Sequence, residues 1–311
     1  MIPQISVRQL QYFAAVYEEG SFSRAAEREN CSQPALSAQV RLLEGVLAST
    51  LFERSASGVV PTFAGRQFYQ HAVAILRSLY VAERDISAIA GHVSGDVCAG
   101  LIPSVVRGLL PTFLPPFVQA YPHINLQLVE GFSGTLLNWL LAQEIDFAVV
   151  VEPPQHEALE ITSLGGGPAV MIAGNQGPVP SGHPVRLQDL PPLKLVLPTP
   201  RHGLRSSIER SIWTKDIKVA RSMQMDSVCG MIEFVKRSDW VTILPTVAII
   251  CDIDSDDLVI NPIVDPPLQG QLYLVHLKKV PLGQSATLFV DALQREVDRA
   301  RSFWESVSDP A

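Results

Sequence analysis

Four polar side chains recur at helical spacing near the N-terminus, in a pattern that can read a nucleic acid. They are Gln33, Ser37, Gln39 and Arg41. Apolar residues of the same segment predict the buried face of a helix, and they are Leu36, Val40 and Leu43. Short polar donors and acceptors bind base edges and phosphates when a helix enters the major groove of DNA. The alternative is that these side chains form a solvated helix face with no partner.

A second group of residues follows predicted strands in the C-terminal part of the chain. The group comprises Pro103, Ser104, Phe132, Ser133, Thr199, Arg201, His202 and Arg205. Open α/β sheets bind ligands beyond the carboxyl ends of their strands, where helix N-termini present N–H groups to anions. Serine hydroxyls can donate hydrogen bonds to a carboxylate or sulfonate, the cationic side chains can add charge, and Phe132 can form an apolar wall. The alternatives are that the serines only cap helices and that the arginines are solvated.

Patterns typical of enzymes and metal sites are missing from the sequence. It has no G-x-S-x-G, P-loop or G-x-G-x-x-G motif, and its seven histidines lack metal-ligand spacing. We therefore expect no catalysis, no metal and no cofactor. The run Gly165-Gly166-Gly167 is interpreted as a turn. Four aspartates resemble calcium ligands but lack the turn glycine and the distal glutamate, so a solvated loop is expected at Asp252, Asp254, Asp256 and Asp257.

Composition indicates a folded protein of two or three units. The 311 residues are 47% hydrophobic and carry a net charge of −7. Residues 1–91 hold eight arginines, no lysine and eight acidic residues, so the negative charge belongs to residues 92–311. No apolar run approaches the roughly 18 residues of a membrane span, and no secretory leader is recognised. Four cysteines without a C-x-x-C motif fit a reducing compartment, and we expect a cytoplasmic protein without a membrane partner.

The N-terminal pattern predicts three short helices followed by a hairpin. The helices are expected over about residues 7–18 and 24–29 and from Ser32 onward. Ala25 and Ala26 allow the close approach of a neighbouring helix. Residues 51–62 predict two short strands around a glycine-containing turn. This arrangement is a helix-turn-helix with a wing.

A long helix without glycine or proline is expected over residues 67–90. Its apolar or small positions alternate by four and three residues, and they are Phe68, Ala72, Ile75, Leu79, Ala82, Ile86 and Ile89. This 3.5-residue period is typical of a coiled-coil seam with a second chain. The alternative is a single amphipathic helix packed on its own chain.

Beyond Gly95, short apolar runs alternate with helical stretches, which predicts an α/β fold with a largely parallel sheet. Extended stretches at residues 159–164 and 258–264 are placed to cross between two lobes. The last strand and helix return to the first lobe. Cys229 and Cys251 both fall in the second lobe, where we weigh a redox pair against two structural cysteines and favour the latter.

The N-terminal motifs resemble those of the LysR-type transcriptional regulators. They are the runs at residues 8–13, 20–26, 32–37, 43–44, 51–54 and 62–65. The resemblance implies that the DNA-binding residues are Ser21, Ser23, Arg24, Ser32, Gln33, Pro34, Ser37, Gln39, Arg41 and Arg54. Ala38 and the wing residues 55–57 lack the basic side chains that many members carry. Fewer phosphate contacts imply weak binding by one chain and reliance on a dimer.

The C-terminal part resembles the effector-binding domain of the same family, which is similar to type 2 periplasmic binding proteins. Matching pieces lie at residues 100–104, 109–111, 117–122, 128–131, 145–146, 195–198, 201–205 and 243–245. The fold class implied is α plus α/β, with a winged helix-turn-helix, a long dimerisation linker helix and a two-lobed α/β effector domain. A homodimer assembling to a homotetramer is implied as well.

These observations predict three parts. Residues 1–62 form the DNA-binding domain, residues 63–91 the linker and dimerisation helix, and residues 92–311 the effector-binding domain. Lobe 1 covers about 92–161 and 265–311, and lobe 2 about 162–264. We expect a transcriptional regulator that binds an inverted repeat in double-stranded DNA, responds to a small organic anion and contacts RNA polymerase. A solute-binding protein or an enzyme on the same fold are the alternative classes.

Overall fold

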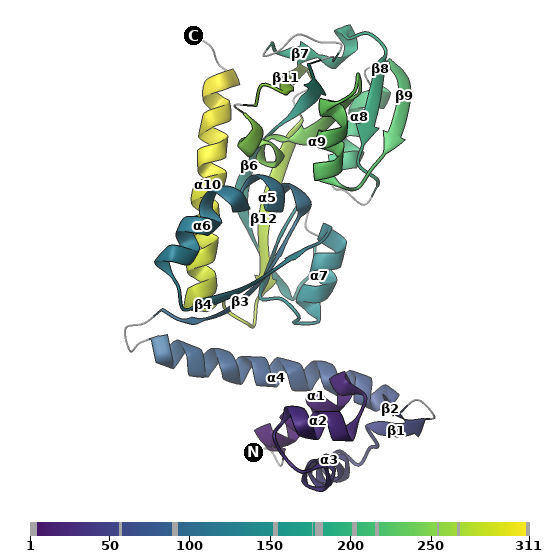
Figure 1. Cartoon of the computed structure of the whole chain (residues 1–311), viewed down its shortest axis with the longest axis vertical. Helices are drawn as coiled ribbons and strands as arrows, with labels where there is room; N and C mark the ends of the chain where they lie inside the picture. The colour runs from purple at the N-terminus through teal and green to yellow at the C-terminus, as the bar shows by residue number, and fades with distance from the viewer. Residues whose placement is uncertain are drawn as a thin grey trace. The chain divides into compact units, whose positions relative to one another are not determined.

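The computed structural model describes residues 5–55, 58–88, 93–151, 155–175, 177, 183–200, 204–214, 218–253, 255–265 and 268–308. The chain divides into two units, Met1–Ala90 and Gly91–Ala311, and each is described by itself (Figure 1). Among the helices in these described ranges, none is both long and apolar enough to cross a membrane.

The N-terminal unit is a winged helix-turn-helix followed by a long helix. Its elements are α1 (Val7–Glu19), α2 (Phe22–Arg28), α3 (Gln33–Leu47), β1 (Phe52–Ser55), β2 (Gly58–Pro61) and α4 (Phe63–Ala88). Ser6 and Gln9 form a reciprocal capping box that begins α1. Gly20, at φ 59°, ends α1 in the left-handed conformation that glycine adopts without strain. The predicted helices are therefore confirmed, with ends that shift by one to four residues.

Two apolar clusters hold this unit together. Ala25 and Ala26 are buried against Leu36 and Val40, so the alanine pair does pack against the third helix. Phe13 lies at the centre of the other cluster, where its ring centroid is 5.1 Å from that of Phe68 in α4. Each cluster takes residues from three or more elements, which fixes α3 and the β1–β2 hairpin relative to one another.

The C-terminal unit has two α/β lobes joined by strands (Figure 1). Lobe 1 contains β3 (Gly95–Leu101), α5 (Pro103–Gly108), α6 (Leu110–Ala120), β4 (Ile124–Glu130), α7 (Ser133–Leu141), β5 (Phe147–Val150), β12 (Gln269–Leu277) and α10 (Gln284–Ser308). Lobe 2 contains β7 (Val185–Arg186), β8 (Leu193–Leu197), α8 (Leu204–Thr214), β9 (Val219–Gln224), α9 (Val228–Lys236), β10 (Val241–Pro245) and β11 (Leu258–Asp265). Short 3-10 turns lie at Leu187–Asp189, Thr246–Ala248 and Ile250–Asp252. Strand β6 (Leu159–Gly174) runs through both lobes.

The sheet is mixed, which corrects the expectation of a largely parallel one. Strand β3 pairs in parallel with β4 and β5, and β8 pairs in parallel with β9 and β10. The long strand β6 instead pairs antiparallel with β12, β10 and β11. Its partner changes from β12 to β10 at Pro168–Ala169, later than the stretch 159–164 expected to cross between the lobes. The antiparallel pairs arise because β6 enters lobe 2 in one direction, whereas β10, β11 and β12 run in the opposite direction beside it.

The glycine run at residues 165–167 lies inside β6 and not in the expected turn. The pairing with β12 skips Leu164, and Gly165 has φ 83°, as a bulge with a left-handed residue requires. A Cβ atom on Gly166 would lie only 1.8 Å from the carbonyl oxygen of Gly270. Glycine is needed here because two backbones pass too closely for a side chain.

Each lobe has its own apolar core. Phe113, Phe147 and Phe289 meet in lobe 1. The ring centroid of Phe289 lies 5.3 Å from that of Phe113 and 5.9 Å from that of Phe147. Alternate residues of β6 enter two different clusters in lobe 2, since successive side chains of a strand face opposite sides. Trp304 of α10 joins one of these clusters, although the rest of that helix packs on lobe 1.

Candidate functional site

Helix α3 presents one buried and one exposed face. Leu36, Val40 and Leu43 are buried, whereas Gln33, Pro34 and Arg41 are exposed and Ser37 and Gln39 are half-buried. Ser32 begins the helix but makes no side-chain capping hydrogen bond, so its exposed hydroxyl is not consumed by the cap. The polar face predicted from the sequence is thus displayed as one surface.

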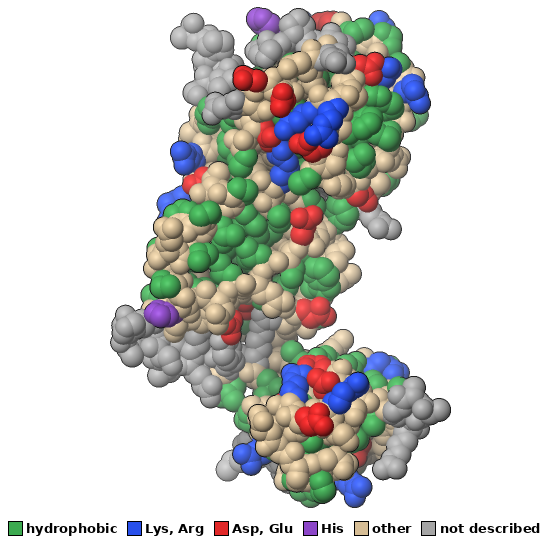
Figure 2. Space-filling model, in the orientation of Figure 1, with side chains coloured by type: hydrophobic (Ala, Val, Ile, Leu, Met, Phe, Trp, Pro, Cys, Tyr) green, Lys and Arg blue, Asp and Glu red, His purple; other side chains and the backbone are tan. Residues whose placement is uncertain are grey.

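The basic side chains of α2 are engaged by acidic neighbours. Arg24 donates a hydrogen bond to the carbonyl oxygen of Glu19 and lies 3.7 Å from its carboxylate. Arg28 lies 2.5 Å from the Glu18 carboxylate, and this hydrogen bond raises the pKa of Arg28. Acidic and basic side chains alternate on the visible face of the N-terminal unit in Figure 2. The net-neutral N-terminal segment therefore does not present a uniformly basic surface.

The remaining DNA-binding candidates lie at the start of α2 and on the wing. The Ser21 hydroxyl caps α2 by accepting from the N–H of Arg24 at 3.4 Å, and Ser23 is exposed. Arg54 lies in β1 opposite Val59, but its side chain is outside the described part of the structure.

Part of the predicted coiled-coil seam is covered by the chain itself. Phe68 and Ala72 pack into the cluster around Phe13. Ile75 and Leu79, further along the same helix face, are 51% and 38% exposed. The side chains of Ala82 and Ile86 and all of Ile89 lie outside the described residues. The exposed part of the predicted seam thus begins at Ile75, because the first turns of α4 complete the core of the N-terminal unit.

Ser104 is the most distinctive residue of the candidate ligand site. It lies in α5, directly beyond the carboxyl end of β3, and only 1% of it is exposed. Its hydroxyl has no hydrogen-bond partner among the described residues, and Ile102 rather than Ser104 occupies the cap position. A buried hydroxyl left without a partner costs about 1–3 kcal/mol. The helix-cap alternative therefore does not account for this serine.

Thr199 is in a comparable position in lobe 2. It follows β8, and its side-chain oxygen is buried without a partner among the described residues. Its backbone N–H donates to the carboxylate of Asp226 at 3.2 Å, which holds the segment in place. In the described part of the chain, each lobe thus carries a buried hydroxyl without a partner just beyond a parallel strand.

Other residues of the predicted ligand site already have structural partners. The Ser133 hydroxyl bonds to both the N–H and the carbonyl oxygen of Val151, and Phe132 caps α7 without a side-chain bond. Arg205 is 8% exposed and donates to the Glu209 carboxylate and to the carbonyl oxygen of Pro198. Arg205 therefore fixes the segment before Thr199. Arg201 and His202 lie outside the described residues.

An ion cluster lies at the boundary of the lobes and was not predicted from the sequence. Arg107 of α5 lies 2.5 Å from the Asp252 carboxylate and donates to the carbonyl oxygen of Ala248 at 2.6 Å. Lys236 of α9 lies 3.4 Å from the same carboxylate. Asp252 is consequently buried and paired, which corrects the expected solvated loop at that position, while Asp254 lies outside the described residues. No local pattern predicts this pairing, since Arg107 and Lys236 are 145 and 16 residues away from Asp252.

The two cysteines of the second lobe have different environments. The Cys251 thiol donates to the carbonyl oxygen of Gly108 at 3.2 Å, and burial, together with the charge of Asp252, raises its pKa. A raised pKa keeps the thiol protonated and unreactive. Cys229 and Cys251 are both free and exposed cysteines, so the contact with Gly108 is what sets Cys251 apart. Within the described ranges, no group of three or more His, Cys, Asp or Glu side chains is placed to hold a metal ion.

Comparison with known proteins identifies the family. The model of the LysR substrate binding domain matches residues 90–298, and that of the bacterial regulatory helix-turn-helix protein, lysR family, matches residues 7–66. The chain belongs to the LysR family. It is a DNA-binding transcriptional regulator with an effector-binding domain.

Individual relatives of this LysR-family chain have several regulatory roles. It is 28% identical to the RuBisCO operon transcriptional regulator of Allochromatium vinosum, over 95% of this chain and 97% of the relative. It is also 28% identical to the hydrogen peroxide-inducible genes activator of Dickeya chrysanthemi, over 94% and 96%. A full-length OxyR variant from Pseudomonas aeruginosa has a TM-score of 0.68 at 20% identity, with 95% of each chain covered. CbnR, a LysR family transcriptional regulator, has a TM-score of 0.62 at 24% identity, over 94% of this chain and 99% of that one. The winged helix-turn-helix and the two-lobed α/β domain are thus the family fold.

Proposed function

We propose that this regulator binds an inverted-repeat operator as a dimer and changes its occupancy when a small organic anion binds between lobes 1 and 2. Residues 1–62 read the DNA, and residues 63–91 join two chains. Residues 92–311 bind the effector, with lobe 1 near 92–161 and 265–311 and lobe 2 near 162–264. Two dimers assemble into a tetramer that contacts RNA polymerase, and the ligand leaves unchanged.

The exposed face of α3 supports the DNA-binding part of this proposal. Gln33 and Arg41 extend from that face, and no ion pair is recorded for Arg41 among the described residues, in contrast to Arg24 and Arg28. Arginine and glutamine are the side chains that pair with guanine and adenine edges in the major groove. Two-fold symmetry of a dimer requires a two-fold site in the DNA.

The DNA-binding proposal is tested by selecting binding sites from random-sequence DNA at fixed salt, followed by footprinting. We expect a dyad-symmetric site that is lost with Gln33→Ala and with Arg41→Ala. Leu42→Ala is the matched control, because Leu42 is 58% exposed on the same helix but has no donor. Enrichment of no sequence at low and moderate salt would contradict the proposal.

The effector part is carried by one observation, the pair of buried hydroxyls at Ser104 and Thr199 that lack hydrogen-bond partners among the described residues. Both follow parallel strands of different lobes, where open α/β sheets bind ligands. Serine and threonine hydroxyls can donate to an acidic group of a ligand, which would remove the cost of leaving them unpaired. We assign Pro103, Phe132 and Ser133 to the wall of this site, and Arg201, His202 and Arg205 to its charge.

A thermal-shift screen of small organic acids, each beside its uncharged amide, tests the effector site. We expect an acid to raise the melting temperature while its amide does not, since binding to the folded state alone stabilises it. Ser104→Ala and Thr199→Val should abolish the shift. Ser222→Ala, an exposed serine in β9, should retain it. A shift that survives both variants would place the ligand elsewhere.

A further inference from the structure

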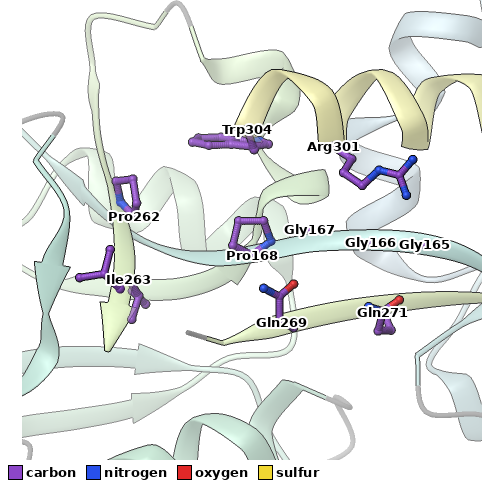
Figure 3. A pocket seen from close by; sticks show the side chains of 11 residues that line it. Gly165, Gly166, Gly167, Pro168, Pro262, Ile263, Gln269, Gln271, Arg301 and Trp304 are labelled. Carbon is purple, nitrogen blue, oxygen red and sulfur yellow. The ribbon is translucent and has the colours of Figure 1, made fainter. Parts of the chain in front are cut away.

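A pocket of about 430 Å³ lies where the strands join the two lobes, and neither Ser104 nor Thr199 lines it. Its walls come from β6, β11, β12 and α10 (Figure 3). Strand β6 passes from lobe 1 to lobe 2, and β11 and β12 belong to different lobes. The pocket, here called the hinge pocket, therefore contacts both connections between the lobes as well as the last helix.

One part of the hinge pocket is apolar and flat. Figure 3 shows the rings of Pro168, Pro262 and Trp304 around the same space, with Ile263 beside them. Rigid rings lose little conformational entropy when a ligand packs on them. This wall suits an aromatic or branched aliphatic group.

The polar groups of the hinge pocket include two strong donors. Trp304 is 3% exposed, yet its indole Nε1 has no hydrogen-bond partner among the described residues. Arg301, one turn earlier on α10, also lines the pocket. Its guanidinium bonds to Asp298 at 2.9 Å and is still 45% exposed. The described lining residues include Gln269 and Gln271 but no aspartate or glutamate, so the charge that these lining residues carry is positive.

Gly165 keeps the space beside the cation open. It has φ 83°, and a Cβ atom at this position would lie 3.2 Å from Nη1 of Arg301. Any other residue would be strained and would crowd the guanidinium. The bulge in β6 thus leaves room for a ligand atom where a regular strand would place a side chain.

We propose that the hinge pocket is a second ligand site, which binds a small carboxylic acid with an apolar ring or branched chain. The carboxylate accepts from Arg301 and from the Trp304 indole, and the apolar part packs on Pro168 and Pro262. A ligand bound here contacts both strand connections and so favours one angle between the lobes. The site is separate from the effector site proposed at Ser104 and Thr199.

Phenylacetate is the probe, because it combines a flat apolar ring with one carboxylate. Its binding to the full-length protein is measured by isothermal titration calorimetry, beside phenylacetamide and benzylamine. We expect saturable binding of phenylacetate, weaker binding of the amide and no binding of the amine. Arg301→Gln should raise the Kd of phenylacetate about tenfold, the size of one charge-assisted hydrogen bond. Trp304→Phe, which keeps a ring and removes the N–H, should raise the Kd about fivefold, as for a neutral hydrogen bond.

Arg299→Gln is the matched control, since Arg299 lies on the same helix, is 80% exposed and does not line the pocket. It should leave the Kd unchanged. Circular dichroism of each variant shows whether it is folded, and Arg301→Gln alters a side chain that is 45% exposed. Absence of saturable binding would overturn the proposal. Binding that is lost in Ser104→Ala but kept in both hinge variants would also overturn it, and would support the effector site instead.

Discussion

At the residue scale, Gly108 is required by the contact between α5 and the segment that follows β10. A Cβ atom on Gly108 would lie 1.7 Å from the carbonyl oxygen of Val247. The clash involves backbone, which cannot rotate away as a side chain can. Gly108→Ala should therefore destabilise the C-terminal unit by about 3 kcal/mol or more.

Urea unfolding followed by tryptophan fluorescence measures this loss, because Trp139, Trp213, Trp240 and Trp304 all lie in the C-terminal unit. Gly45→Ala is the control, and its urea unfolding is followed by far-UV circular dichroism because residues 1–90 contain no tryptophan. Nothing lies within 4 Å of a Cβ at Gly45, which is in the interior of α3, so alanine should stabilise the N-terminal unit by about 0.5–1 kcal/mol. If both substitutions changed the free energy of unfolding equally, the backbone at Val247 would have to move away from the new Cβ atom at position 108 at little cost.

Ser104 gives a second prediction at the residue scale. Because its buried hydroxyl has no partner among the described residues, Ser104→Ala should leave the free energy of unfolding unchanged or raise it by about 1 kcal/mol in ligand-free protein. The same urea experiment, without added organic acid, measures it. A loss of more than about 1 kcal/mol would mean that the hydroxyl is satisfied within the protein.

At the scale of elements, the ion cluster ties α5 to α9 and to the turn at Ile250–Asp252. Burial raises the pKa of Asp252, but the hydrogen bond from Arg107 and the charges of Arg107 and Lys236 outweigh it, so the pKa lies below its ordinary value. A carboxylate whose pKa is lowered by folding stabilises the protein above its unfolded pKa, about 3.9. That contribution is lost as the pH falls through the lower, folded value.

Asp252→Asn should therefore destabilise the C-terminal unit at pH 7. The difference in the free energy of unfolding between this variant and the wild type should shrink as the pH falls below about 4. Urea midpoints measured between pH 3 and 7 test this prediction. Asp189→Asn is the control, because Asp189 is exposed and no ion pair is recorded for it among the described residues. A destabilisation by Asp252→Asn that stays constant with pH would mean that packing, rather than charge, sets the cost.

At the scale of the whole molecule, assembly is expected to depend on the exposed part of α4. Ile75 and Leu79 are 51% and 38% exposed on one helix face. Replacing both with aspartate should yield monomers, because buried like charges at a seam are strongly unfavourable. Sedimentation velocity measures the mass, and operator binding should weaken at least tenfold because two half-sites are no longer held together.

Leu42→Asp is the control for assembly, since Leu42 is 58% exposed but lies on α3. It should leave the mass unchanged, whatever it does to DNA binding. A dimer that persists in the Ile75→Asp, Leu79→Asp variant would show that other surfaces hold the chains together.

Local pattern was sufficient for much of the fold. The spacing of Leu36, Val40 and Leu43 predicted both the helix and its buried face, because a helix of 3.6 residues per turn must place such residues together. The alanine pair and the wing followed from side-chain size and turn residues, and the quoted motifs pointed to the LysR family. These features depend on neighbours within a few turns of the chain.

Features that depend on distant residues were beyond the reach of the sequence. From the sequence, Gly165–Gly167 is predicted to be a turn, but in the structure this run pairs with β12. Asp252 is predicted to be solvated, but in the structure its carboxylate lies 2.5 Å from Arg107. Residue type alone also could not separate Ser104, whose hydroxyl has no partner in the described part of the structure, from Ser133 and Arg205, which have several. Periodicity records which face of an element is buried, whereas the partner on that face is selected by the packing of segments more than a hundred residues apart.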